Sequence, residues 1–164
     1  MSFWESKNLE KMHYTAAKLV QQETEVTVSN DPGARALLRL VVQDVFSVLW
    51  PEIIEGGTIC YLFAFKHSTD ADEGMEIDGI TYTHIQPLTG NTIHSLGLSE
   101  DALSRGPVYA AWCLIHEIAH ALTGDMDHGY IFHTTLDGLY QRYNEARGTS
   151  LANDYQRLEA PEIP

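Results

Sequence analysis

The sequence predicts a single α+β domain, with helices at both ends of the chain and a small mixed or antiparallel sheet between them. Helical periodicity marks the first and last thirds, whereas apolar or alternating segments punctuated by glycine mark the middle third. The 164 residues, 44% of them hydrophobic, suit one domain with its own core. We therefore expect one domain over residues 1–164, with a flexible tail from about residue 148.

Two helices are expected before the sheet. Residues 5–23 place apolar side chains close to a helical period, and a short extended segment follows at 24–29. Residues 30–33, Asn-Asp-Pro-Gly, supply a capping residue and then a proline, which is typical of a helix start. The wide apolar face over 34–50 predicts a buried second helix, which Pro51 is expected to end.

Three strand candidates occupy the middle of the chain. Residues 58–66 are apolar and aromatic on both alternating faces, which predicts a central strand covered on both sides. After a polar, acidic loop at 67–74, residues 75–86 alternate but are interrupted by Asp78-Gly79, so they predict a strand with a tight turn or a hairpin. Residues 92–98 predict a further strand.

Two helices are expected to close the domain. Ser99 has the character of an N-cap, and a Gly-Pro pair then starts a strongly apolar helix over 108–122. A short loop at 123–127 leads to a last helix over 129–146, which Gly148 is expected to cap.

The charge balance bears on the class of partner. The chain has 23 acidic and 10 basic residues, and its formal net charge is −13. Affinity for nucleic acids depends on Lys and Arg side chains that displace counterions from phosphates. A nucleic-acid partner is therefore disfavoured.

Cysteine usage and hydropathy indicate the compartment. Cys60 and Cys113 are too few for a disulfide framework, and both lie in apolar runs where a thiol is expected to be buried. The N-terminus has no apolar targeting segment, and no stretch reaches the roughly 18 apolar residues of a membrane span. We expect a cytoplasmic protein without a membrane segment.

The segment His116-Glu117-Ile118-Ala119-His120 is the most informative part of the sequence. In a helix, residues at i and i+4 lie on one face, so His116 and His120 can share a metal ion. Glu117 can then reach a water molecule on that ion. In zinc hydrolases the metal lowers the pKa of the water toward about 7, and the glutamate takes the proton and later delivers it to the leaving group.

A catalytic zinc ion typically has three protein ligands, so one more is needed. His128 is the leading candidate, because it follows a loop short enough to fold the chain back; His133, in the last helix, is the alternative. Asp125 and Asp127 are close enough in sequence to be oxygen ligands or acceptors for a ligand imidazole, although most loop aspartates face water.

Three features stand together within residues 108–146: His116-Glu117-x-x-His120, a short loop containing Gly124, and His128-Gly129-x-x-Phe132. This combination resembles the SprT-like zinc metallopeptidases, whose motif is His-Glu-x-x-His followed by His-Gly-Pro-x-Phe, and small bacterial metallohydrolases with the same pattern. Tyr130 replaces the proline. The resemblance implies a minimal zincin-like fold that holds zinc through His116, His120 and His128. It also implies Glu117 as general base and a peptide or protein substrate that binds as an extra strand beside the sheet edge.

Other functions remain open. YbeY-type endoribonucleases use His-x-x-x-His-x-x-Gly-x-Asp-His, which Gly124, Asp127 and His128 match in part, but they lack a glutamate after the first histidine. Glu117 therefore favours a peptidase. A third possibility is a zinc-binding domain that has no catalytic activity and serves as an interaction module.

A hydrogen-bond donor near the metal is needed to stabilise the oxyanion that forms during hydrolysis. Three residues are candidates, although a packing or rim position is the ordinary expectation for each: Tyr109, Tyr130 and His133.

Overall fold

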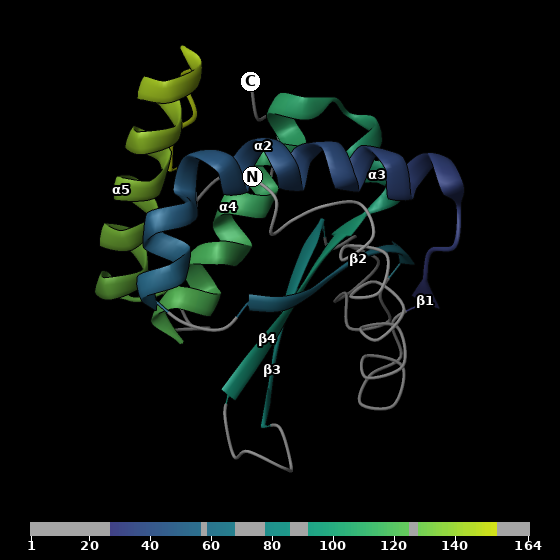
Figure 1. Ribbon diagram of the computed structural model, residues 1–164, viewed down its shortest axis with the longest axis horizontal. Coiled ribbons are helices and arrows are strands. Elements are labelled where there is room, and N and C mark those ends of the chain that lie inside the picture. The colour runs from purple at the N-terminus through teal and green to yellow at the C-terminus, as the bar shows by residue number, and fades with distance from the viewer. Residues whose placement is uncertain (1–26, 57–58, 68–77, 86–91, 125–127, 154–164) are drawn as a thin grey trace.

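The computed structural model describes residues 27–56, 59–67, 78–85, 92–124 and 128–153, which form the predicted α+β fold (Figure 1). In chain order the elements are β1 (Thr27–Val28), α2 (Pro32–Gly56), β2 (Ile59–His67), β3 (Gly79–Ile85), β4 (Thr92–Ser99), α3 (Glu100–Ser104), α4 (Pro107–Thr123) and α5 (Tyr130–Arg147). The helix expected over residues 5–23 lies outside the described residues.

The sheet is mixed, with strand order β1-β2-β4-β3. Strands β2 and β4 are parallel, while β1 and β3 run antiparallel to their neighbours. Residues 62–65 of β2 are all buried, so the prediction of a strand covered on both sides is confirmed. Over residues 79–85 the chain forms one continuous strand, which lies at an edge of the described sheet.

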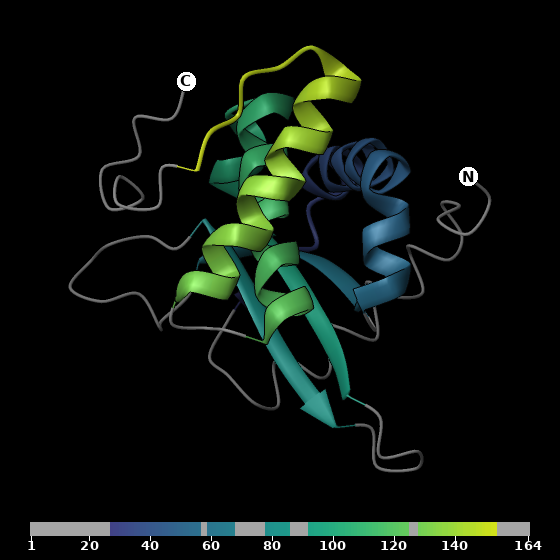
Figure 2. The same cartoon turned by 90° about the vertical axis from the view of Figure 1, so that its left-hand side faces the viewer.

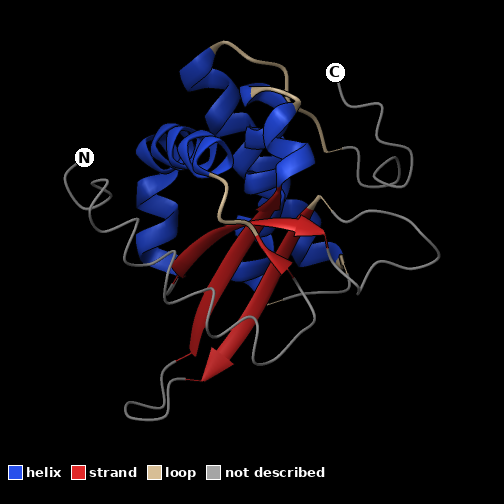
Figure 3. Ribbon diagram, turned by 90° about the vertical axis from the view of Figure 1, so that its right-hand side faces the viewer, coloured by secondary structure: helices blue, strands red, loops and turns tan. Residues whose placement is uncertain are grey.

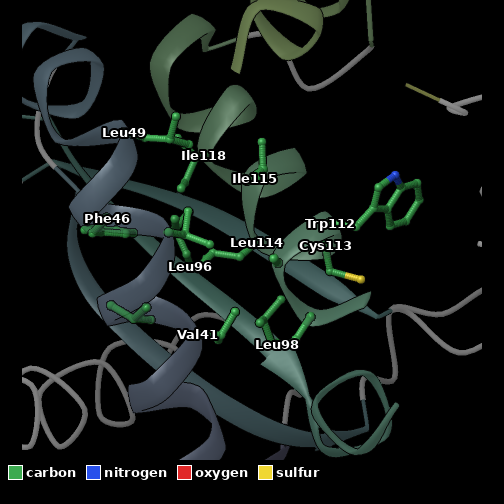
Figure 4. Packing of buried hydrophobic residues seen from close by; sticks show 14 of the residues in the cluster. Val41, Phe46, Leu49, Leu96, Leu98, Trp112, Cys113, Leu114, Ile115 and Ile118 are labelled. Carbon is green, nitrogen blue, oxygen red and sulfur yellow. The ribbon is translucent and has the colours of Figure 1, made fainter. Parts of the chain in front are cut away.

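The helices lie over one face of the sheet, as Figures 1 and 3 show. The core forms between that face and helices α2, α4 and α5, with alternate residues of β2 and β4, such as Leu62 and Leu96, pointing into it. In the view of Figure 4, Phe46 of α2 lies to the left of Leu96 and Ile118 of α4 lies above it, and all three belong to the core. Figure 2 shows α5 running beside α4, so the last helix buttresses the helix that carries the histidine motif.

The sequence predicted that α2 ends at Pro51. This prediction is wrong, because the helix continues to Gly56. A proline inside a helix removes one backbone hydrogen bond and bends the axis, and α2 does change direction in its second half (Figure 1). Beyond the proline, Ile53 is buried in the core, and Glu52 forms an ion pair with Arg142 of α5 at 2.7 Å. These contacts offset the cost of the proline, so tertiary packing extends the helix.

The chain after α5 is packed for several residues beyond its cap. Gly148 adopts a left-handed conformation, and its N–H donates to the Asn144 carbonyl at 2.8 Å, as expected for a helix end. The Asn144 side chain then bonds both the N–H and the carbonyl of Leu151, each at 2.8 Å, and Leu151 is buried. Residues 149–153 are therefore attached to the domain, and a flexible tail does not begin at 148. Residues 154–164 lie outside the described part of the chain.

Two expectations about membranes and thiols can be compared with the structure. Among the described residues, no helix combines the length and the apolar composition that crossing a membrane requires. Cys113 is a free thiol and is buried, as predicted, while the side chain of Cys60 is outside the described set.

Candidate metal centre

Helix α4 places the histidine motif in the interior of the protein. Gly106, with φ of 111°, and Pro107 start the helix, and Gly124 ends it in a left-handed conformation with its N–H bonded to the His120 carbonyl. Every residue from 109 to 121 is buried, so both histidines lie in a packed environment. Imidazoles in such a place need partners or a metal ion.

The side chains of His116, His120 and His128 converge. Their ligand atoms all lie within 4.8 Å of one another, and Nε2 of His116 is 3.2 Å from Nε2 of both His120 and His128. Two nitrogens bound to one tetrahedral zinc at 2.0–2.1 Å would be about 3.3 Å apart. The three imidazoles therefore fit a zinc ion without rearrangement of the two short pairs, and His128, rather than His133, completes the group.

An unusual backbone conformation aims His128 at α4. Its φ is 59°, the only positive φ of a non-glycine residue in the described part of the chain. The left-handed region costs a residue with a Cβ roughly 1–2 kcal/mol. Gly129 follows as the N-cap of α5, so a sharp turn immediately before the helix brings the imidazole back over the motif. A strained turn at this place is consistent with a site that depends on the position of His128.

Phe132 packs against all three histidines. Its ring centroid lies 5.0 Å from that of His116, 4.4 Å from that of His120 and 4.7 Å from that of His128. The side chain is fully buried and comes from the first turn of α5. An apolar wall of this kind excludes water and fixes ring orientation. The sequence carried the signal for this residue, because Phe132 belongs to the motif that follows His128, but a packing role in the site was not assigned to it.

Burial keeps His116 in the form that binds metals. Desolvation, together with the neighbouring His120, His128 and His133, lowers the pKa of His116 to about 2. A neutral imidazole offers a free lone pair, and metal binding then competes with few protons near neutral pH.

The pKa of Glu117 is shifted in the opposite direction to that of His116. Burial raises the pKa of its carboxyl group to about 7, while a hydrogen bond from the Thr81 hydroxyl to Oε1, 2.6 Å long, acts against the rise. Its side chain is directed at strand β3, where it also lies close to Gly79. Sequence reasoning did not find Thr81 or Gly79, because nothing local in a strand marks a contact with a helix 36 positions away.

The remaining candidates lie outside the histidine group. His133 is not one of the converging ligands; its Nδ1 is 3.0 Å from the side-chain nitrogen of Asn153. Tyr130 is 84% exposed, and the Tyr109 hydroxyl donates to the carboxylate of Asp78. Neither tyrosine is brought into the histidine group. Asp125 and Asp127 lie outside the described residues.

Comparisons with protein-family models, with curated proteins and with solved structures find no match to this chain.

Proposed function

We propose that this protein is a zinc-dependent metallopeptidase of the His-Glu-x-x-His type. The observation that carries the proposal is the buried Glu117 of α4 beside His116 and His120 of the same helix, which converge with His128 into a group of three histidines. In metal-assisted hydrolysis, two histidines at i and i+4 bind the metal ion and the glutamate between them acts as the general base. The SprT-like resemblance of the motif supports the same activity.

Zinc is the proposed cofactor, held by His116, His120 and His128. Imidazole nitrogens suit zinc as well as copper, iron and nickel. Among the described residues the group offers nitrogen ligands alone, which argues against ions that prefer oxygen, such as Mg²⁺. When bound, zinc would supply Lewis acidity that polarises a carbonyl group and makes a water molecule more acidic.

Glu117 is the proposed general base. A carboxyl group with a pKa of about 7 can both accept and return a proton near neutral pH, which is what hydrolysis of an amide requires. Its carboxylate would take a proton from the attacking water and then deliver it to the amine nitrogen as the C–N bond breaks. Phe132 and the buried face of α4 shield His116 and His120 from bulk water, while His128 is partly exposed.

A peptide or protein fits the charge of the molecule better than RNA does. The formal net charge is −13, and three of the described arginines are in ion pairs: Arg105 with Asp101, Arg142 with Glu52 and Arg147 with Asp44. Strand β3 lies at an edge of the described sheet and beside Glu117, where an extended peptide could add as a further strand. The free, buried Cys113 supports a reducing, cytoplasmic setting as part of the proposal.

The test measures metal content and hydrolysis on the same samples. Purified protein should hold about one zinc per chain and cleave members of a mixed peptide library. Glu117→Gln should keep the zinc and lose turnover, and Glu145→Gln, the same change at an exposed position of α5, should keep both. Equal cleavage by wild type and Glu117→Gln would overturn the mechanism.

The alternatives give different results in the same assay. Metal-dependent cleavage of RNA, lost in His128→Ala, would indicate the ribonuclease. Loss of stability on chelation without turnover of any peptide would indicate a zinc domain that serves as an interaction module.

A further inference from the structure

Two residues of strand β3 hold the carboxyl group of Glu117. The Thr81 hydroxyl donates to Oε1 at 2.6 Å, and Gly79, two positions earlier on the same face of the strand, lies beside Oε2. A Cβ atom on Gly79 would be 2.7 Å from Oε2 of Glu117, which is too close for a Cβ contact, and 3.0 Å from its Cδ, which is tight. A hydrogen bond thus fixes one carboxylate oxygen, and the other has room because Gly79 has no side chain.

The Thr81 hydroxyl has one proton and two nearby acceptors on the same residue. It lies 2.6 Å from Oε1 and 3.2 Å from the main-chain carbonyl oxygen of Glu117. The shorter contact identifies the carboxylate as the acceptor, since hydrogen bonds to a charged or strongly polar oxygen are shorter. This arrangement keeps Oε1 close to the backbone of α4 and restricts the torsion angles of the glutamate.

Strand β3 is itself fixed relative to α4. Gly79 and Thr81 both lie in the antiparallel ladder with β4. Asp78, immediately before the strand, accepts a hydrogen bond from the hydroxyl of Tyr109 in the first turn of α4. The strand that contacts Glu117 is therefore anchored both to the sheet and to the helix that carries the motif.

We propose that Gly79 and Thr81 are positioning residues for Glu117: together they select the orientation in which its carboxylate acts as the base. The inference rests on the proposed function. A glutamate side chain has three rotatable bonds, and a base that is displaced by about 1 Å loses much of its effect. Thr81 supplies the direction of one oxygen, and Gly79 supplies the space for the other.

Substitutions on one face of β3 separate this role from a general effect on the strand. Thr81→Val removes the hydroxyl, and Thr81→Ser keeps it. Thr83→Val is the control: it removes a hydroxyl two positions further along the strand, which lies 3.1 Å from Nδ1 of His94. We expect Thr81→Val to lower kcat about 10- to 100-fold with KM little changed, and Thr81→Ser to restore kcat to within about threefold of wild type. Thr83→Val should also remain within about threefold.

Gly79→Ala tests the other half of the proposal. The atoms that a new Cβ would meet belong to the flexible end of Glu117, so the fold can accommodate the methyl group only if the carboxylate moves. We expect kcat to fall at least as far as in Thr81→Val, with zinc content and thermal stability close to those of wild type.

The same substitutions in the Glu117→Gln background identify the route of the effect. If Thr81 acts through the carboxylate, Thr81→Val should change the residual rate of Glu117→Gln by less than about twofold. A further loss equal to that seen in wild type would overturn the proposal, because Thr81 would then act independently of Glu117. Equal rates for Thr81→Val and Thr81→Ser would overturn it as well.

Crystal structures of the zinc-loaded variants give a measurement that does not depend on activity. The Glu117 carboxylate should keep its orientation in Thr81→Ser and turn away in Thr81→Val and Gly79→Ala. An unchanged carboxylate in both of the latter would overturn the proposal. A zinc-loaded wild type that cleaves no peptide would refute the proposed function, while the orientation of Glu117 in these variants would still decide whether the two residues position it.

Discussion

The Nε2 atoms of His116 and His128 lie 3.2 Å apart, although the residues are 12 positions apart in the chain and His128 lies outside α4, just before the N-cap of α5. Two backbone features produce this approach: Gly124 ends α4 in a left-handed conformation, and His128 turns the chain with a positive φ before α5 begins. A metal ion shared by the two imidazoles requires such a close approach of their nitrogens.

His128→Ala should weaken zinc binding far more than His133→Ala. Loss of one of three ligands removes much of the binding energy, whereas His133 is not one of the converging ligands, so its loss should lower the metal affinity far less. Competition with a chromogenic chelator measures both affinities. Comparable losses in the two variants would mean that His133 shares the role of third ligand.

Glu117→Gln should change how the stability of the metal-free protein depends on pH. Because burial raises the pKa of Glu117 in the folded protein to about 7, above the usual 4.5, the folded state binds this proton more tightly than the unfolded chain does. Its stabilising contribution is fully present below pH 4.5 and is lost as the pH rises through 7.

Relative to Glu117→Gln, the wild-type protein should therefore lose up to about 3 kcal/mol of unfolding free energy between pH 4.5 and pH 8. Urea denaturation of both proteins at several pH values measures this difference, and the contribution of His116 cancels because both proteins contain it. Glu145→Gln, at an exposed position, should track wild type throughout. A difference between wild type and Glu117→Gln that stays constant with pH would be inconsistent with a raised pKa.

Phe132→Ala should damage both the core and the metal centre. The fully buried ring contacts all three histidines, so its removal leaves a cavity that should cost about 3–5 kcal/mol of stability. Phe132→Leu keeps most of the side-chain volume, so its loss of stability should be clearly smaller than that of Phe132→Ala. Thermal unfolding with and without zinc measures both effects. If Phe132→Ala binds zinc as tightly as wild type, the ring is only a core residue.

Asn144→Ala should release the segment that follows α5. Its side chain makes two hydrogen bonds of 2.8 Å to the backbone of Leu151, and we expect a loss of about 1–2 kcal/mol together with faster amide exchange over residues 149–151. Gln141→Ala, on the exposed face of the same helix, is the control. Unchanged exchange at Leu151 in Asn144→Ala would show that other contacts hold the segment.

Local signals predicted much of this fold. The structure confirms three predicted helix ends: the N-cap at Ser99, the start of α4 at Pro107 and the cap of α5 at Gly148. Each could be predicted because it depends on a few adjacent residues. The spacing of His116 and His120 placed both on one helical face for the same reason.

The features that the sequence did not reveal are non-local. Helix α2 runs past Pro51 because Ile53 is buried by distant residues, and the side chain of Asn144 holds Thr149 and Leu151. The contact of Thr81 with Glu117 likewise depends on how a strand and a helix pack. No periodicity or short motif encodes contacts of this kind.

An anomalous-scattering measurement at the zinc absorption edge, on crystals of the zinc-loaded protein, tests the central claim most directly. The claim is that three histidines hold a metal ion beside Glu117. It predicts one strong peak per chain, bonded to Nε2 of His116, His120 and His128. A zinc-loaded crystal with no peak at these three nitrogens, or with zinc bound elsewhere on the chain, would contradict it.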